Sequence, residues 1–216
     1  MSMRSPNLAG AFVLKGAALL FAVSSLLAGA FVAQAQPKIG EEAPLFAAKN
    51  TKGETVSLEA LRGQPVILEW TNHDCPFVMK HYETGNMQKT QRALVEAGVT
   101  WISIISSAPG TQGHVSADEA NSIAASRGSY ADHIILDPKG DLGRLYKART
   151  TPDMFLIDGD GTLLYQGAID DKPSARHSSI EGAKNYVLAA FADMQAGQPV
   201  RDAETKPYGC SVKYAF

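Results

Sequence analysis

Two adjoining stretches, Pro65-Val-Ile-Leu-Glu-Trp70 and Thr71-Asn-His-Asp-Cys-Pro76, decide the fold of this chain. The first is a compact apolar run, which is typical of a strand buried inside a sheet. Pro76 suits the first turn of a helix, because the N–H that proline lacks has no partner there in any case. The pattern therefore predicts a buried strand, a short turn that carries Cys75, and a helix from 77 to about 97.

Strands and helices alternate on either side of this unit. The turn offers candidate N-caps in Thr71, Asn72 and Asp74, and Gly98 is suited to end the helix. The other predicted strands cover about residues 55–58, 99–105, 133–136, 154–157 and 162–168, and the other helices cover about 116–128, 141–146 and 179–196. Ser116 and Glu119 have the spacing of a capping box at the start of one of these helices.

The last two strands are joined by Asp158-Gly-Asp-Gly161, a strong signal for a tight hairpin turn. A calcium loop is excluded, because the further spaced acids and the closing Glu of such a loop are missing. Alternating strands and helices predict a sheet with helices on both faces, and the hairpin makes that sheet mixed. A strand–helix–strand half followed by a strand–strand–helix half is the order of the thioredoxin-like α/β fold, here with an N-terminal strand extension.

The first 35 residues have the composition of a targeting segment. Arg4 and Lys15 are their only charged side chains, an apolar stretch runs from Ala11 to Val32, and Ala33-Gln-Ala35 fits a signal peptidase. We therefore predict a cleaved signal peptide over 1–35 and a periplasmic or secreted protein. The apolar run after Lys15 is about long enough to cross a bilayer, so an uncleaved anchor is the alternative.

The rest of the chain predicts one domain and a tail. Residues 36–197 are enough for one hydrophobic core, and residues 198–216 hold two prolines and no periodicity, which indicates an extended tail. Removing Arg4 and Lys15 makes the formal net charge of −2 more negative. Without a run of Lys or Arg, binding to nucleic acid or to a membrane surface has no electrostatic support.

Several segments resemble the peroxiredoxin-like branch of the redoxin family, the alkyl hydroperoxide reductase/thiol-specific antioxidant type. The entry strand and the stretch Asn72-His-Asp-Cys-Pro-Phe-Val78 resemble its active-site region, and Thr151-Pro152 resembles the cis-proline segment of thioredoxins. Residues 195–200 and 209–213 are similar to the C-terminal signature of that branch. The resemblance covers residues 40–213 and implies a thioredoxin fold with redox chemistry at a thiol.

The chain departs from the active-site patterns of both thioredoxins and peroxiredoxins. A thioredoxin has Cys-x-x-Cys at this turn, and here Asn72 stands in the first position and only Cys75 remains. A peroxiredoxin has Pro and Thr where this chain has Leu68 and Asn72, and an Arg where it has Pro152. The resemblance therefore supports the fold more strongly than it supports peroxidase activity.

Cys75 is the candidate catalytic residue. The reactive form of cysteine is the thiolate, and unpaired N–H groups at the start of a helix stabilise such an anion. A protonated His73 would lower the pKa of the thiol further, whereas an ionised Asp74 would raise it. The competing interpretation is a buried, unreactive Cys that packs as a small apolar residue.

Cys210 is the only other cysteine of the chain. It is a candidate resolving thiol that would form a disulfide with an oxidised Cys75, and the alternative is a free or structural thiol. A disulfide needs the two Cα atoms within about 7 Å of each other.

Two further positions belong to the expected active-site environment. The resemblance implies a cis peptide bond before Pro152, against the turn, and a backbone at Thr151 that pairs with an extended substrate peptide. Glu69 ends the apolar strand, and it is either a buried proton acceptor or a solvated edge residue. We expect no metal, because His73, Cys75 and His81 do not have the spacing of a structural zinc site, and we expect no cofactor.

Two functions are open at this stage. The first is an exported thiol-based oxidoreductase that acts through Cys75 on a protein thiol or disulfide or on a small hydroperoxide, with an unidentified reductant. The second is a non-enzymatic module that holds a peptide along the cis-proline edge.

Overall fold

The computed structural model describes residues 37–215, and the predicted signal peptide over 1–35 lies outside them. The elements of the first half are β1 (Ala47–Lys49), β2 (Thr55–Ser57), the 3-10 turn η1 (Glu59–Leu61), β3 (Val66–Trp70), α1 (Pro76–Glu83), α2 (Asn86–Val95), β4 (Thr100–Ile105) and α3 (Ala117–Ser126). Those of the second half are β5 (His133–Leu136), α4 (Asp141–Tyr146), β6 (Thr150–Thr151), β7 (Asp153–Ile157), β8 (Leu163–Gly167), η2 (His177–Ile180), α5 (Tyr186–Gln195) and β9 (Cys210–Ser211).

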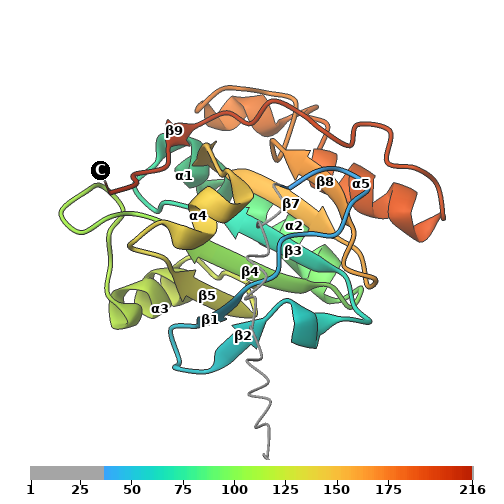
Figure 1. The fold of residues 1–216 in the computed structure, drawn as a ribbon. Coiled ribbons are helices and arrows are strands. Elements are labelled where there is room, and N and C mark those ends of the chain that lie inside the picture. The colour runs from blue at the N-terminus through green and yellow to red at the C-terminus, as the bar shows by residue number, and fades with distance from the viewer. Residues whose placement is uncertain (1–36, 216) are drawn as a thin grey trace, which may run out of the picture. The chain divides into compact units, whose positions relative to one another are not determined.

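The central sheet of residues 37–215 has five strands in the order β5-β4-β3-β7-β8 (Figure 1). β3 runs parallel to β4 and antiparallel to β7, and β7 forms an antiparallel hairpin with β8. The predicted mixed sheet is therefore confirmed. Asp158 also forms the predicted hairpin turn, since its Oδ1 accepts the N–H of Thr162 at 2.8 Å.

β3 lies at the centre of the core because both of its faces are buried. Leu68 and its neighbours on one face pack with β1, β2 and α4 through a cluster that includes Tyr146. Ile67, on the opposite face, belongs to a cluster that contains side chains of α1, α2 and α5, such as Val78. Helices thus cover both faces of the sheet, as the strand–helix alternation predicts, and the fold is thioredoxin-like.

Two predicted helices differ from the observed ones. The helix expected over 77–97 is divided into α1 and α2, because Gly85 between them adopts a left-handed conformation with φ of 74°. The helix expected over 179–196 begins only at Tyr186, where the Asn185 side chain caps it by accepting the N–H of Leu188. The capping box at Ser116 and Glu119 is present as predicted.

Within residues 37–215, no helix is long and apolar enough to cross a bilayer.

The core at β3 generates a stability prediction. Leu68 is fully buried, so we expect Leu68→Ala to lower the free energy of unfolding by about 3 kcal/mol through lost burial and the cavity it leaves. Leu45→Ala is the matched control, because Leu45 is 46% exposed, and it should cost less than about 0.5 kcal/mol. Urea denaturation measures both. Equal losses would contradict the central place of β3 in the core.

Candidate active site

Cys75 lies where β3 has ended and α1 begins. It is the N-cap residue of α1, and Pro76 occupies the first helical position as predicted. None of the three predicted side-chain caps fills the N-cap position, because the turn continues to Cys75 before the helix starts. The side chain of Cys75 is fully buried.

The cis-proline segment packs directly on this cysteine. The peptide bond between Thr151 and Pro152 is cis, as the resemblance implies. Cys75 Sγ donates a hydrogen bond to the Thr151 carbonyl at 3.1 Å. Thr151 lies in the two-residue strand β6, which places this carbonyl at the edge of the active-site turn.

The C-terminal tail brings the second cysteine to the first. β9 pairs antiparallel with β6, with Cys210 opposite Thr151. The backbone N–H of Cys210 donates to Cys75 Sγ at 3.4 Å. Both cysteines are free thiols, Cys75 buried and Cys210 partly exposed. The two candidate thiols, 135 positions apart in sequence, are therefore neighbours in space.

The surroundings make the two thiols unequal acids. Burial raises the pKa of Cys75, but hydrogen bonds from the side chains of Cys210 and Thr151 and from the backbone N–H groups of Cys210 and Val78 outweigh it, so the pKa is lowered overall. Burial and the neighbouring Cys75 raise the pKa of Cys210 to about 11. Cys75 is therefore the member of the pair that forms a thiolate more readily.

Asn72, His73 and Asp74 shape the turn. Asn72 is buried, its Oδ1 accepts the N–H of Asp74 at 2.9 Å, and its Nδ2 donates to the carbonyl of Gln112 at 3.2 Å. His73 Nε2 lies 3.2 Å from Asp74 Oδ1. Among the described residues, neither His73 nor Asp74 forms a hydrogen bond with Cys75 Sγ, so the effects expected of them on the thiol are not carried by direct contact.

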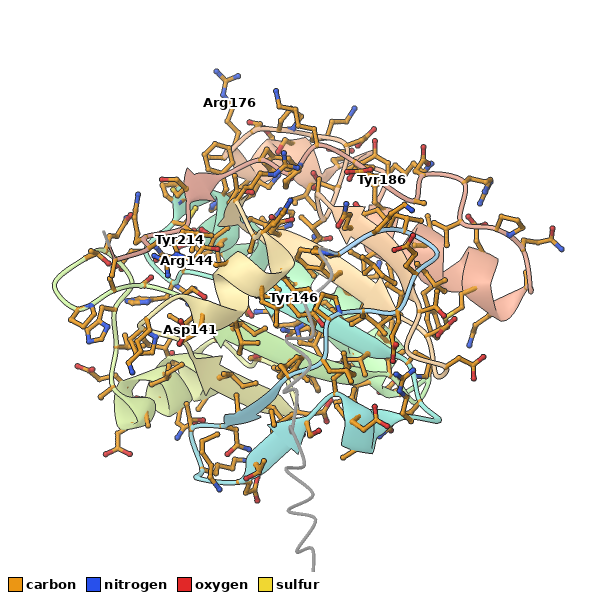
Figure 2. The ribbon with its side chains drawn as sticks, in the orientation of Figure 1. Asp141, Arg144, Tyr146, Arg176, Tyr186 and Tyr214 are labelled. Carbon is orange, nitrogen blue, oxygen red and sulfur yellow. The ribbon has the colours of Figure 1, made fainter. Side chains whose placement is uncertain are left out.

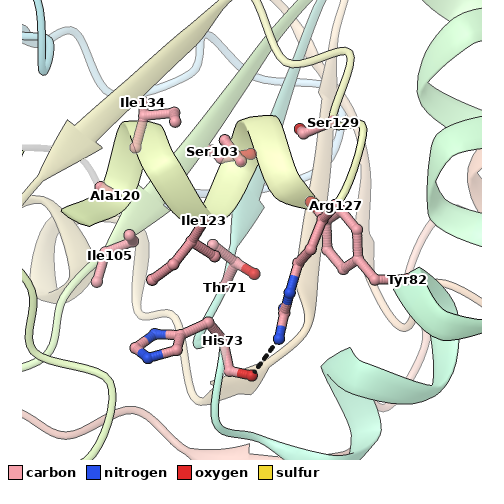
Figure 3. Close-up of a pocket in the computed structure, with 11 residues that line it drawn as sticks. Thr71, His73, Tyr82, Ser103, Ile105, Ala120, Ile123, Arg127, Ser129 and Ile134 are labelled. Atoms are coloured by element: carbon pink, nitrogen blue, oxygen red, sulfur yellow. Dashed lines mark hydrogen bonds between the residues drawn. The ribbon is translucent and has the colours of Figure 1, made fainter. Parts of the chain in front are cut away.

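Arg127, from the end of α3, also holds this turn, and sequence reasoning did not find it. Its Nη2 donates to the carbonyl of His73 at 2.8 Å, and its guanidinium lies 5.3 Å from the ring centre of Tyr82 (Figure 3). These residues line a small cavity beside the turn, whose apolar wall includes Ile105 and Ile123. No sequence signal connects Arg127 to a turn 54 positions earlier.

Glu69 is buried, so the solvated interpretation of this residue is wrong. Its side chain is fully buried. Its Oε2 accepts hydrogen bonds from Trp101 Nε1 at 2.9 Å, Ser103 Oγ at 2.9 Å and Gln91 Nε2 at 3.4 Å, whereas Oε1 has no partner. Burial raises the pKa of Glu69 despite these hydrogen bonds, which favours the protonated acid.

A second buried polar cluster lies on the far half of α1, and no local pattern in the sequence predicts it. Lys80 is fully buried, and its Nζ lies 3.5 Å from Asp170 Oδ2 and donates to Tyr208 Oη at 3.2 Å. The Tyr208 hydroxyl donates to Asp170 Oδ1. Burial, followed by the charge of Lys80, lowers the pKa of the adjacent His81 to about 3, so this imidazole is neutral. The cluster joins α1, whose N-cap residue is Cys75, to the tail that carries Cys210.

Residues 37–215 contain no group of three or more His, Cys, Asp or Glu side chains placed to hold a metal ion.

Comparisons with known proteins bear on the family and the fold of the chain. A family model described as "AhpC/TSA family" matches residues 39–166, more than half of the chain. An uncharacterized conserved protein from Geobacillus kaustophilus is similar in structure, with 25% identity, a TM-score of 0.67, and coverage of 82% of this chain and 93% of that one. The hypothetical protein SMc02350 from Sinorhizobium meliloti 1021 has 18% identity, a TM-score of 0.68, and coverage of 84% and 97%. No curated protein matches the chain significantly.

The coupling of the two thiols predicts that removing the Cys210 thiol changes the pKa of Cys75. Because the Cys210 side chain donates to Cys75 and lowers its pKa, Cys210→Ala should raise the pKa of Cys75. The rate of alkylation of Cys75 by iodoacetamide, measured against pH, reports this value. Ser211→Ala, which changes an exposed side chain of the same strand, is the control and should leave the pKa of Cys75 unchanged. A pKa of Cys75 that is the same in Cys210→Ala and in wild type would contradict the coupling.

Glu69 predicts a pH dependence of stability. Its folded pKa is raised above the ordinary 4.5, so the folded state binds more protons than the unfolded state just above that pH, and stability falls as pH rises from about 4.5 through the folded pKa. Glu69→Gln keeps an acceptor for the three donors and removes this titration. We expect the urea-measured stability of wild type to decline relative to that of Glu69→Gln from pH 5 to pH 8. Parallel curves for the two proteins would refute the assignment.

Proposed function

The chain belongs to the AhpC/TSA family, and from this premise we propose that it is an exported thiol-based oxidoreductase. In this proposal Cys75 is the thiol whose thiolate attacks the oxidant, and Cys210 of the same chain is the resolving thiol. Export follows from the predicted signal peptide over 1–35, which would place the enzyme in the periplasm or outside the cell, where a disulfide can persist.

The observation that supports this most directly is the contact between the tail and the sulfur. The N–H of Cys210 lies 3.4 Å from Cys75 Sγ, and the pairing of β9 with β6 holds it there. A resolving thiol must reach the oxidised sulfur without a large rearrangement, and this tail provides one from within the chain. Asn72 cannot take that role, so the resolving thiol in this proposal comes from the strand β9 and not from the turn that carries Cys75.

Two oxidants fit this chemistry. With a hydroperoxide, the Cys75 thiolate attacks the terminal oxygen, the O–O bond breaks, and an alcohol leaves as Cys75 becomes a sulfenic acid. With a disulfide, the thiolate displaces one thiol and forms a mixed disulfide. In either case the Cys210 thiol then attacks Cys75, forming the Cys75–Cys210 disulfide and releasing water or the second thiol.

The oxidised pair must then be reduced by an external dithiol. Cys210 is the partly exposed member of the pair, so an attacking thiolate reaches its sulfur first. Cys75, with the lower pKa, is the better leaving group. The lowered pKa of Cys75 therefore assists both its oxidation and its release.

The binding-module alternative has less support. It needs a free backbone edge at the cis-proline segment, and here β9 already pairs with Thr150 and Thr151.

Cysteine variants test the proposal. In the wild type, hydrogen peroxide or hydroxyethyl disulfide should convert both thiols to one intramolecular disulfide, which mass spectrometry of alkylated peptides detects. In Cys210→Ser, oxidation should stop at a sulfenic acid on Cys75, which dimedone labels, or at a mixed disulfide on Cys75. Cys75→Ser should abolish turnover with dithiothreitol as reductant. Equal turnover in wild type and Cys75→Ser would overturn the proposed function.

A further inference from the structure

The edge strand at the cis-proline segment is occupied by the protein's own tail. Thr151 pairs with Cys210 and Thr150 with Ser211 in an antiparallel ladder, and the N–H of Val212 donates to the Arg149 carbonyl at 3.1 Å. An extended peptide that adds to a sheet edge uses the same backbone groups. The tail therefore holds the position that the resemblance to thioredoxins assigns to a substrate peptide.

Gly209 lets the tail approach this closely. It has a φ of 139°, a region that side-chain-bearing residues rarely adopt. A Cβ at this position would lie 2.0 Å from the Thr151 carbonyl oxygen, which is the acceptor for Cys75 Sγ. Any other residue at 209 would push the strand away from Thr151.

Upstream of Gly209, Tyr208 anchors the tail to the helix of Cys75. Its hydroxyl donates to Asp170 and accepts from Lys80, and its ring packs edge-on against Phe77 with 5.8 Å between ring centres. Lys80 Nζ also donates to the carbonyl of Lys172 at 3.2 Å. Because Lys80 and Asp170 are buried, loss of the Tyr208 hydroxyl would leave charged groups short of partners, which is costly.

Downstream of Cys210, a second anchor holds the tail. The Tyr214 hydroxyl donates to the Ala148 carbonyl at 2.7 Å, and the Arg144 guanidinium lies 4.9 Å from its ring centre (Figure 2). The N–H of Ala108 donates to the carbonyl of Lys213 at 2.8 Å. The strand β9 is thus fixed on both sides, and Cys75, next to it, is fully buried.

We propose that residues 208–214 close the cis-proline edge to extended peptides, and that Gly209 is the specificity-determining residue that makes this closure possible. Because a peptide disulfide reaches Cys75 by pairing with β6, it must first displace the tail, whereas a small oxidant does not need that pairing. The inference rests on the proposed function of Cys75. It assigns oxidants of low molecular weight as the substrates of Cys75 and excludes disulfides in extended protein segments as substrates.

The test compares two disulfides of different size on the same thiol. Hydroxyethyl disulfide is the small probe and insulin is the protein probe, and mass spectrometry of alkylated peptides measures the consumption of the Cys75 thiol. The ratio of the insulin rate constant to the hydroxyethyl disulfide rate constant is the readout. Both reactions need the same thiolate, so a change in the pKa of Cys75 cancels in this ratio.

Gly209→Ala should raise this ratio by about tenfold or more, because the tail strand no longer competes with the peptide for β6. Tyr208→Ala, which removes the upstream anchor without a backbone clash, is a second variant with the same expected direction. Gly197→Ala is the matched control, since Gly197 also has a positive φ, 64°, but a Cβ there meets nothing within 4 Å. Circular dichroism and urea denaturation confirm that each variant is folded.

The outcomes separate the two proposals. A raised ratio in both tail variants and an unchanged ratio in Gly197→Ala support closure of the edge. A ratio that stays at the wild-type value in Gly209→Ala and Tyr208→Ala overturns the closure and leaves the proposed function standing. If Cys75 reacts with neither probe nor hydrogen peroxide in any of these proteins, the proposed function fails and the inference fails with it.

Discussion

The sulfur of Cys75 lies between two backbone groups, the carbonyl of Thr151 and the N–H of Cys210, and the rest of the site depends on this arrangement. The first group brings the cis-proline segment to the start of α1, and the second brings the tail to the same point. A thiol with no exposed surface would ordinarily have a raised pKa. Here hydrogen bonds that the sulfur accepts, from the Cys210 and Thr151 side chains and from the backbone N–H groups of Cys210 and Val78, reverse that effect and lower the pKa of Cys75.

A buried network of Lys80, Asp170 and Tyr208 holds the tail against α1 and so fixes the position of Cys210 relative to Cys75. Lys80 and Asp170 are removed from water, and such pairs contribute little net stability when compared with apolar packing. What this pair does provide is a fixed position for Tyr208, because a loose tail would leave an ammonium and a carboxylate without their shared hydroxyl. The network therefore couples the geometry of α1 to the geometry of the tail, and so couples the positions of the two thiols.

The sequence is informative where local signals are strong, and silent where contacts join distant segments. The apolar run to Trp70, the hairpin turn at Asp158 and the capping box at Ser116 have local patterns, and the structure has each of them. The sequence does not predict the break at Gly85, because a single glycine is compatible with a continuous helix. β6 and β9 have two residues each, too few for any periodicity, and their pairing depends on tertiary contacts. For the same reason Tyr208 has no distinguishing feature in the sequence of an irregular tail.

The structure relates the presence of Asn72 at the position of the first thioredoxin cysteine to the position of Cys210 in the tail. At position 72, where a thioredoxin has its first cysteine, the Asn72 amide is fixed between the N–H of Asp74 and the carbonyl of Gln112. A Cβ on the neighbouring Gly113 would collide with this amide, at 2.3 Å from Oδ1, so the loop is fitted closely around it. The turn is thereby stabilised by a side chain that cannot do redox chemistry, and the second thiol comes from a strand that covers the peptide edge. In the proposed mechanism, delivery of the resolving thiol by β9 and an edge open to peptides are mutually exclusive, because both would use the one backbone ladder at Thr151.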